Sequence, residues 1–235
     1  MDRRQFNSHS VPVMLAAVML LAQRDAQALS IDDLSHAEAS QGLKAALEKG
    51  ARAAVSALGK TDGFLGNEKV RIPLPGYLED VARLLRALGQ GGRIDELVTA
   101  MNRGAEAAVP MARDLLVGAV RTMTVSDAKK ILLGGETSVT AFFAEKTRAP
   151  LNVRFLPVVT QATARVGLAQ KYNQLAGQAA DLGLVKKDDA NIQQYVTGKS
   201  LDGLYWMIGE EEKKIRRDPV ATGSAVLQKV FGALK

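Results

Sequence analysis

The chain has 235 residues, of which 47% are hydrophobic, so it is long enough to bury a core without disulfide or metal staples. It contains no cysteine, which excludes disulfides and a thiol nucleophile. The net charge of +6 suits either anionic lipid headgroups and cell-wall polymers or an ordinary surface with a modest excess of lysine. Aromatic residues make up only 5% of the chain and form no motif with basic residues, which argues against a nucleic-acid partner.

The first 28 residues show the three regions of a secretory signal peptide. Arg3-Arg4 precedes the apolar run of residues 11–22, which is too short to span a membrane, and Ala26-Gln27-Ala28 matches a cleavage pattern. A buried N-terminal helix or an uncleaved anchor is the alternative interpretation. We therefore expect residues 1–28 to be removed, the mature protein to begin near Leu29, and export to the periplasm by the Sec or twin-arginine route.

The rest of the chain, residues 29–235, is predicted to form one all-α domain. Apolar side chains recur every three to four positions, and the alternation typical of strands is nearly absent. We expect an irregular multi-helix bundle of eight to ten helices, with at most one short extended segment near 69–73. The predicted helices cover, approximately, residues 37–58, 75–88, 94–123, 124–133, 137–148, 151–166, 168–182, 191–217 and 220–234.

Several residues are expected to start, bend or interrupt these helices. Pro110 lies in the middle of the helix over 94–123 and should kink it or split it in two. Pro157 should interrupt the helix over 151–166, and Gly198 is a candidate break in the helix over 191–217. Thr124 with Asp127 is predicted to cap the short helix over 124–133.

Two stretches resemble signatures of a bacterial family catalogued as domain-of-unknown-function family 4197. Gly42–Leu47 resembles Gly-Leu-Lys-Glu-Ala-Leu, with Ala45 in place of glutamate, and Asp202–Tyr205 resembles Asp-Gly-Leu-Phe, with Tyr205 in place of phenylalanine. The resemblance implies an exported bacterial protein of this length, and it assigns no activity and no catalytic residue. Further stretches that resemble the family, in the same order, are residues 60–65, 72–75, 101–103, 155–157, 172–177 and 208–212.

No catalytic residue, metal ligand set or cofactor is predicted, and an enzyme is the less favoured class. The mature chain has one histidine, His36, which leaves neither a zinc site nor a catalytic triad to assemble. Glu210-Glu211-Glu212 fan around a helix instead of converging on one ion, so a solvated charged face is the favoured interpretation.

Polar residues at apolar helix positions are the candidate ligand-binding residues. Asn102 and Glu106 are four residues apart on one predicted helix, and a buried glutamate there needs a cation, which Arg103, Arg113 or Lys44 would supply. The functional interpretation is a polar anchor at the end of a ligand cavity. The alternative, which we favour, is a hydrogen-bond network that fixes the register of the helices.

Tyr172 and Asp202 are the other two candidates for ligand binding, with the same two interpretations. Gly203 and Gly209 lie inside a predicted helix, where each glycine costs about 1 kcal/mol relative to alanine. Close approach of another element offsets that cost, and so does room for a ligand. Trp206, between the two glycines, is assigned to the core.

Two functions remain open at this point. The favoured one is a periplasmic, non-catalytic binder or carrier of an apolar or amphiphilic envelope molecule such as a lipid, without an integral membrane span. The alternative is an envelope structural or interaction module that contacts another protein or the cell wall through an exposed patch.

Overall fold

The computed structural model describes residues 36–181 and 190–218. These residues contain helices and no strand, which confirms the predicted all-α class. The predicted signal peptide (1–28) and the predicted last helix (220–234) lie outside the described residues. The elements are α2 (His36–Leu58), α3 (Gly76–Ala87), α4 (Gly91–Ala108), the short 3₁₀ helix η2 (Val109–Met111), α5 (Ala112–Arg121), α6 (Val125–Leu133), α7 (Ser138–Thr163), α8 (Gly167–Asp181) and α9 (Ile192–Arg217).

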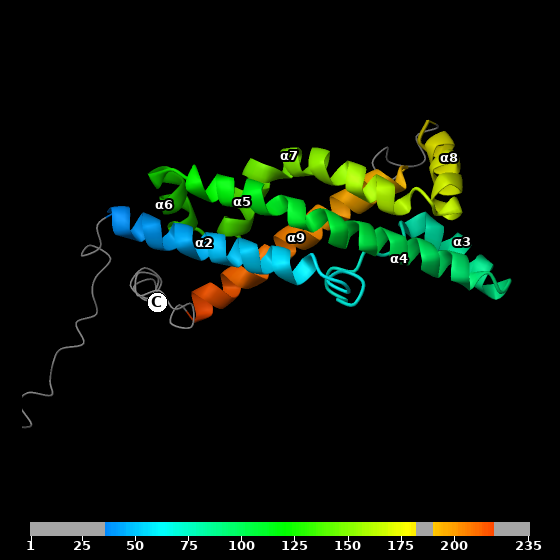
Figure 1. Cartoon of the computed structure of the whole chain (residues 1–235), viewed down its shortest axis with the longest axis horizontal. Helices are drawn as coiled ribbons and strands as arrows, with labels where there is room; N and C mark the ends of the chain where they lie inside the picture. Colours follow the sequence, from blue (N-terminus) through cyan, green and yellow to red (C-terminus); the bar gives the residue numbers. More distant parts are fainter. Residues whose placement is uncertain (1–35, 182–189, 219–235) are drawn as a thin grey trace, which may run out of the picture.

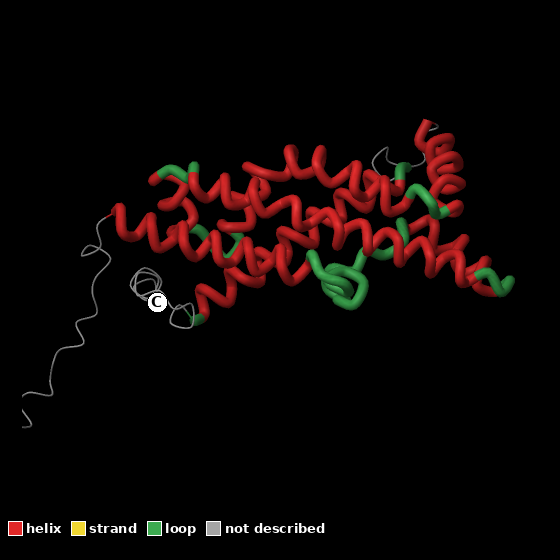
Figure 2. Tube along the Cα trace, viewed as in Figure 1, coloured by secondary structure: helices red, strands yellow, loops and turns green. Residues whose placement is uncertain are grey.

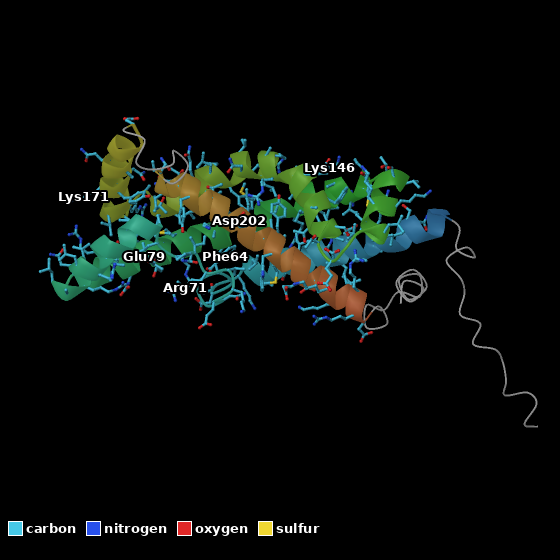
Figure 3. The ribbon with its side chains drawn as sticks, turned by 180° about the vertical axis from the view of Figure 1, so that it is seen from behind. Phe64, Arg71, Glu79, Lys146, Lys171 and Asp202 are labelled. Carbon is cyan, nitrogen blue, oxygen red and sulfur yellow. The ribbon has the colours of Figure 1, made fainter. Side chains whose placement is uncertain are left out.

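The helices form an elongated bundle (Figure 1). α2, α7 and the α4–α5 pair run along its length, and α9 crosses them obliquely. The most extensive contacts join α7 to α9 and to α4, and α2 to α9 and to α5. α3 and α8 lie at one end of the bundle and α6 at the other (Figure 1). α9 therefore contacts α7, α2 and α4 as it crosses one face of the bundle (Figure 3).

Two of the predicted helix boundaries are confirmed. The helix over 94–123 is split at Pro110, where η2 separates α4 from α5. Thr124 caps α6: its hydroxyl accepts a hydrogen bond from the Asp127 N–H, and the Asp127 carboxylate accepts one from the Thr124 N–H at 3.0 Å. Proline and a capping box act through local sterics and local hydrogen bonds, so their effect is visible in the sequence.

The division of residues 137–166 into two helices is wrong. α7 is one continuous helix that contains both Pro150 and Pro157. Each proline removes a backbone hydrogen bond, at a cost of about 3 kcal/mol, and burial of one long face against α4 and α9 offsets it. α9 likewise continues through Gly198. The buried positions of α7 that form this face are spaced four residues apart: Val139, Phe143, Thr147, Leu151, Phe155, Val159 and Thr163.

The solvated charged surface expected at Glu210-Glu211-Glu212 is found for only two of the three residues. Glu210 and Glu211 pair with Lys213 and Lys214, as expected for a charged surface. The side chain of Glu212 is instead 2% exposed, and its Oε1 accepts hydrogen bonds from Arg216 at 2.8 and 3.0 Å. Burial raises the pKa of the Glu212 carboxyl, although Arg216 opposes the rise. The prediction failed at this residue because α9 packs here against the first turn of α7.

The segment between α2 and α3, residues 59–75, is the longest non-helical stretch of the described chain (Figure 2). Its expected extended piece near 69–73 forms no strand. Phe64 and Ile72 of this segment are 0% and 1% exposed, and they belong to the same hydrophobic core as the helices. We call residues 59–75 the clamped loop, because two side chains of α4 hold it on the bundle.

Candidate ligand-binding groove

Asn102 of α4 holds the clamped loop at Ile72. The Asn102 side chain is fully buried, and its Oδ1 accepts a hydrogen bond from the Ile72 N–H at 2.9 Å. Its Nδ2 donates to the Ile72 carbonyl at 3.0 Å and to the Val98 carbonyl at 2.9 Å. The Asn102 amide therefore provides hydrogen-bond partners for both the N–H and the C=O of Ile72, which is buried and belongs to no helix or strand.

Glu106, one turn further along α4, holds the loop at a second point. Its Oε1 accepts hydrogen bonds from the backbone N–H groups of Phe64 at 3.0 Å and Leu65 at 3.1 Å. Arg103 donates to Oε2 at 2.6 Å and also to Asp62 at 2.9 Å. Glu106 is 5% exposed, so Arg103 supplies the compensating charge that a buried carboxylate requires.

The loop is seated directly on α9 because residue 203 is glycine. A Cβ at Gly203 would lie 2.7 Å from Cε1 of Phe64 and 3.3 Å from Cβ of Val70, both closer than ordinary van der Waals contact. Gly203 therefore serves the close approach of another element, one of the two uses expected for it. The contact fixes the position of residues 69–73 along α9.

A groove of about 270 Å³ lies between the clamped loop and α9. Val70, Ile72 and Gly203 form its buried floor, and it is also lined by Lys69, Arg71, Pro73, Lys199, Asp202 and Trp206. We call it the tryptophan groove. Arg71 and Asp202 lie on the same face of the bundle, near the loop that carries Phe64 (Figure 3).

The rim of the tryptophan groove carries an excess of positive charge. Lys69, Arg71 and Lys199 are exposed and form no ion pair within the part of the chain that the structure describes. The Lys199 ammonium lies 5.7 Å from the centre of the Tyr195 ring. Asp202 is the acidic residue of the lining, and Arg148 neutralises it across a 2.8 Å ion pair. The groove therefore favours an anionic group.

Trp206 adds an apolar surface beside these charges. Its side chain is 39% exposed, so its assignment to the core is wrong. The residue lies three positions after Gly203 on α9, and it faces the groove instead of the bundle interior. An indole that is partly exposed presents both a flat apolar face and an N–H donor, which suits the boundary between the polar and apolar parts of a ligand.

The four predicted ligand-binding residues do not form one site. Asn102 and Glu106 lie together under the clamped loop, and their hydrogen bonds are made to the protein itself. Tyr172 is buried on α8, at the end of the bundle, and Asp202 alone lines the tryptophan groove. Sequence reasoning missed Lys69, Arg71 and Lys199 because isolated surface cations carry no pattern.

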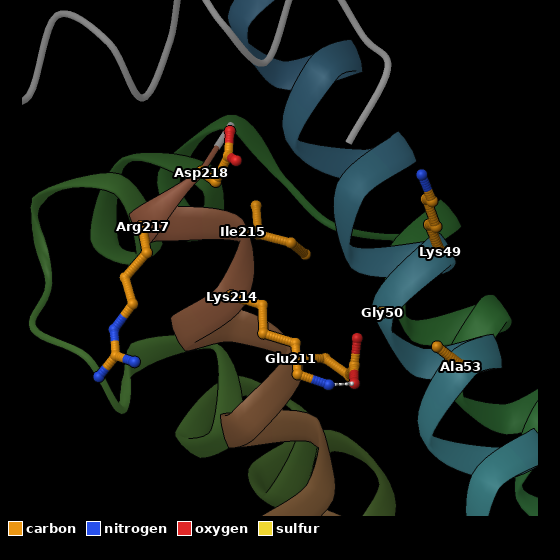
Figure 4. Close-up of a pocket in the computed structure, with 8 residues that line it drawn as sticks. All are labelled: Lys49, Gly50, Ala53, Glu211, Lys214, Ile215, Arg217 and Asp218. Carbon is orange, nitrogen blue, oxygen red and sulfur yellow. Dashed lines mark hydrogen bonds and ion pairs between the residues drawn. The ribbon is translucent and has the colours of Figure 1, made fainter. Parts of the chain in front are cut away.

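A different groove, of about 410 Å³, lies between residues 49–53 of α2 and the C-terminal end of α9 (Figure 4). Gly50, Ala53 and Ile215 line its apolar part, and Lys214 at its edge is paired with Glu211 at 2.7 Å. Asp218, which also lines it, is the last residue described before the C-terminal segment. The tryptophan groove is the better candidate because its three cations have no acidic partner in the described chain.

The fold and the groove define an all-α protein that presents a loop, clamped by buried polar side chains, beside α9. The chain belongs to the DUF4197 family, described as proteins of unknown function, whose sequence model matches residues 33–232. Comparisons with curated proteins and with solved structures gave no match. Four of the stretches that resemble the family, residues 60–65, 72–75, 101–103 and 202–205, meet around the clamped loop.

Two further properties concern membranes and metals. No helix in residues 36–181 and 190–218 is both long enough and apolar enough to cross a lipid bilayer. Within the same residues, no three histidine, cysteine, aspartate or glutamate side chains gather into a group that would hold a metal ion.

Proposed function

We propose that this protein is an exported, non-catalytic binder or carrier of an anionic amphiphile of the cell envelope, and that the tryptophan groove is its binding site. The observation that carries the proposal is the combination of three cations that lack an acidic partner in the described chain with an apolar floor and a half-exposed indole. An anionic head group would contact Lys69, Arg71 and Lys199. The apolar part would lie against Trp206 and Val70.

Two features of the groove support binding over catalysis. Its acidic lining residue, Asp202, is engaged by Arg148, and no second carboxylate lines the groove to share acid–base work with it. Its floor is held rigidly, because Asn102 fixes Ile72 and Gly203 seats Val70. A rigid floor lowers the entropy cost of binding, whereas proton transfer requires a titrating group that is free to react.

The single tryptophan makes this proposal directly testable, because Trp206 reports its own environment by fluorescence. We expect vesicles of phosphatidylglycerol to shift the Trp206 emission to shorter wavelength, and vesicles of phosphatidylcholine to have no such effect. Replacing both lysines of the groove (Lys69→Gln with Lys199→Gln) should weaken binding about tenfold or more, since each cation near an anionic surface contributes about 1 kcal/mol.

A matched control removes two positive charges elsewhere. Lys129→Gln with Lys130→Gln makes the same change in net charge on α6, at an end of the bundle that is distant from the clamped loop. This control should bind like the original protein. An equal loss in both double variants, or no spectral change with any anionic lipid, would contradict the proposal.

An interaction module is the second candidate, favoured by an apolar pair on α3 and at its C-terminal cap. Leu84 and Leu88 are 61% and 64% exposed and lie one helical turn apart. Leu84→Ser with Leu88→Ser should abolish any partner recovered by crosslinking if this function is correct, while leaving the Trp206 response to lipid unchanged.

A further inference from the structure

The groove between α2 and the C-terminal end of α9 has no role in the binding of an amphiphile at Trp206, and its walls are mainly apolar. We call it the α2–α9 groove. Its volume is about 410 Å³, and Gly50, Ala53 and Ile215 form its apolar part (Figure 4). We propose that the C-terminal segment of this same chain, residues 219–235, docks in the α2–α9 groove through the apolar face of an amphipathic helix.

Small residues of α2 leave room for such a helix. A Cβ at Gly50 would lie 3.6 Å from both Cβ of Glu211 and Cδ1 of Ile215, so α2 and α9 are in contact at this glycine. Ala53, about one turn further along α2, is exposed. The side chain of Ile215 packs partly against the core and points from α9 towards α2 (Figure 4). The groove therefore offers an apolar floor beside two small residues, which suits the large apolar side chains of a helix.

The chain leaves α9 at this groove. α9 ends at Arg217, and Asp218, which lines the groove, has φ −135° and ψ 79°, outside the helical region. Residue 219 is proline, which lacks the N–H that would continue α9 and is favoured in the first turn of a new helix. Aspartate is favoured immediately before such a turn. The sequence therefore predicts that a new helix starts at the groove itself, with no linker in between.

The sequence of residues 219–235 carries one apolar stripe. Leu227, Val230, Phe231 and Leu234 recur at spacings of three and four residues, whereas Lys229 falls on the opposite side of the predicted helix. A single helix of about 15 residues is marginal in water, so it needs an apolar surface on which to pack. The family model extends to residue 232 and covers most of this stripe. The family pattern thus includes both the groove and the segment that we assign to it.

The absence of cysteine from the sequence makes docking measurable with one introduced thiol. In the variant Ala53→Cys, the docked segment should shield the thiol from a maleimide reagent. Replacing two residues of the apolar stripe as well (Leu227→Ser with Phe231→Ser) should raise the labelling rate about tenfold or more, because the segment loses its two largest apolar contacts with the groove. The control, Gln228→Ser with Lys229→Ser, changes two polar residues of the same segment and should leave the rate unchanged.

A second experiment identifies the chain whose segment occupies the groove. Treatment of the variant Ala53→Cys with Leu227→Cys with a short bis-maleimide should crosslink the two thiols within one chain, and the product should migrate as a monomer on a denaturing gel. A crosslink between two chains, which assigns the groove to a second copy, would overturn the proposal, and so would the absence of any crosslink. Equal labelling rates of the Ala53→Cys thiol with the original and the serine-substituted stripe would also overturn it. These measurements do not involve Trp206, so they are independent of the amphiphile proposal.

Discussion

Asn102 and Glu106 show how individual polar residues on a mainly apolar helix face hold a loop of the same chain in place. Asn102 hydrogen-bonds both the N–H and the C=O of Ile72, as a neighbouring β-strand would do in a sheet. Glu106 accepts hydrogen bonds from two consecutive N–H groups of the loop. Their spacing in the sequence predicts that they share a helix face and that Glu106 needs a cation. The loop residues that they hold lie 30 to 42 positions away in the chain, so only the fold identifies those partners. The cation is Arg103, three positions before Glu106 and one of the candidates that the sequence offers.

The first prediction at this scale concerns Asn102. We expect Asn102→Ala to lower the free energy of unfolding by about 2–4 kcal/mol, because the buried N–H and C=O of Ile72 lose their partners. Urea denaturation followed by circular dichroism measures the change. Asn152→Ala, at an exposed position of α7, is the matched control and should change stability by less than about 0.5 kcal/mol. Equal effects of the two substitutions would show that the clamp does not stabilise the fold.

The second prediction concerns the cap of α6 and its dependence on pH. Hydrogen bonds from the Thr124 N–H and hydroxyl lower the pKa of Asp127 below its ordinary value of 3.8. A carboxyl with a lowered folded-state pKa stabilises the protein above its unfolded-state pKa, and this contribution is lost as the pH falls through the folded-state value. Asp127→Asn should therefore be less stable than the original protein at pH 7, and the difference should shrink below about pH 3.8. A difference that is constant with pH would contradict the ionised cap.

At the scale of elements, the glycines of α9 differ in whether another part of the chain packs against them. Gly203 faces Phe64 and Val70 at short distances, whereas a Cβ at Gly198, in the same helix, would meet nothing within 4 Å. Both residues are read identically from sequence, as glycines that weaken a helix. The difference between them arises from the loop that packs on one and not on the other.

These two glycines provide a matched pair of substitutions. Gly198→Ala should raise the free energy of unfolding by about 1 kcal/mol, because alanine favours the helix and nothing obstructs it. Gly203→Ala should lower it by about 1–2 kcal/mol, because the methyl group displaces Phe64 and Val70. Thermal denaturation distinguishes the two. A stabilising effect at both positions would mean that the loop yields without cost.

α7 shows the limit of local reasoning about elements. Pro150 and Pro157 are strong helix breakers in isolation, and the sequence pattern around them predicts two helices. The buried stripe of α7 continues across both prolines because α4 and α9 cover it along its length. At Pro110 the same residue type does separate two helices. The outcome at each proline therefore depends on the packing on either side, which is tertiary information.

At the scale of the whole molecule, stability and binding should respond differently to salt. The ion pairs of the described chain lie largely at the surface, where each contributes little to folding, and the core is apolar. The cations that line the tryptophan groove would act on the proposed anionic ligand instead. The proposed binding is thus mainly electrostatic, whereas folding is mainly hydrophobic.

Because the proposed binding is mainly electrostatic and folding mainly hydrophobic, the two should respond differently to ionic strength. Raising NaCl from about 0.05 M to 0.5 M should weaken binding of anionic vesicles severalfold or more, because the screening length falls below the separation of exposed charges. The urea midpoint of unfolding should change little over the same range. Binding that is insensitive to salt would point to the apolar contacts of Trp206 as the main source of affinity.

The sequence by itself determined the all-α class, the membership of the family, the split at Pro110 and the cap at Thr124, because periodicity, sterics and capping act over a few neighbouring residues. Only the tertiary structure decided that α7 is continuous, that Glu212 is buried and that Trp206 is half exposed. It alone placed Lys69, Arg71 and Lys199 around one groove. The physical reason is that burial and the convergence of charges depend on contacts between residues that are far apart in the chain, and no local pattern encodes which of them meet.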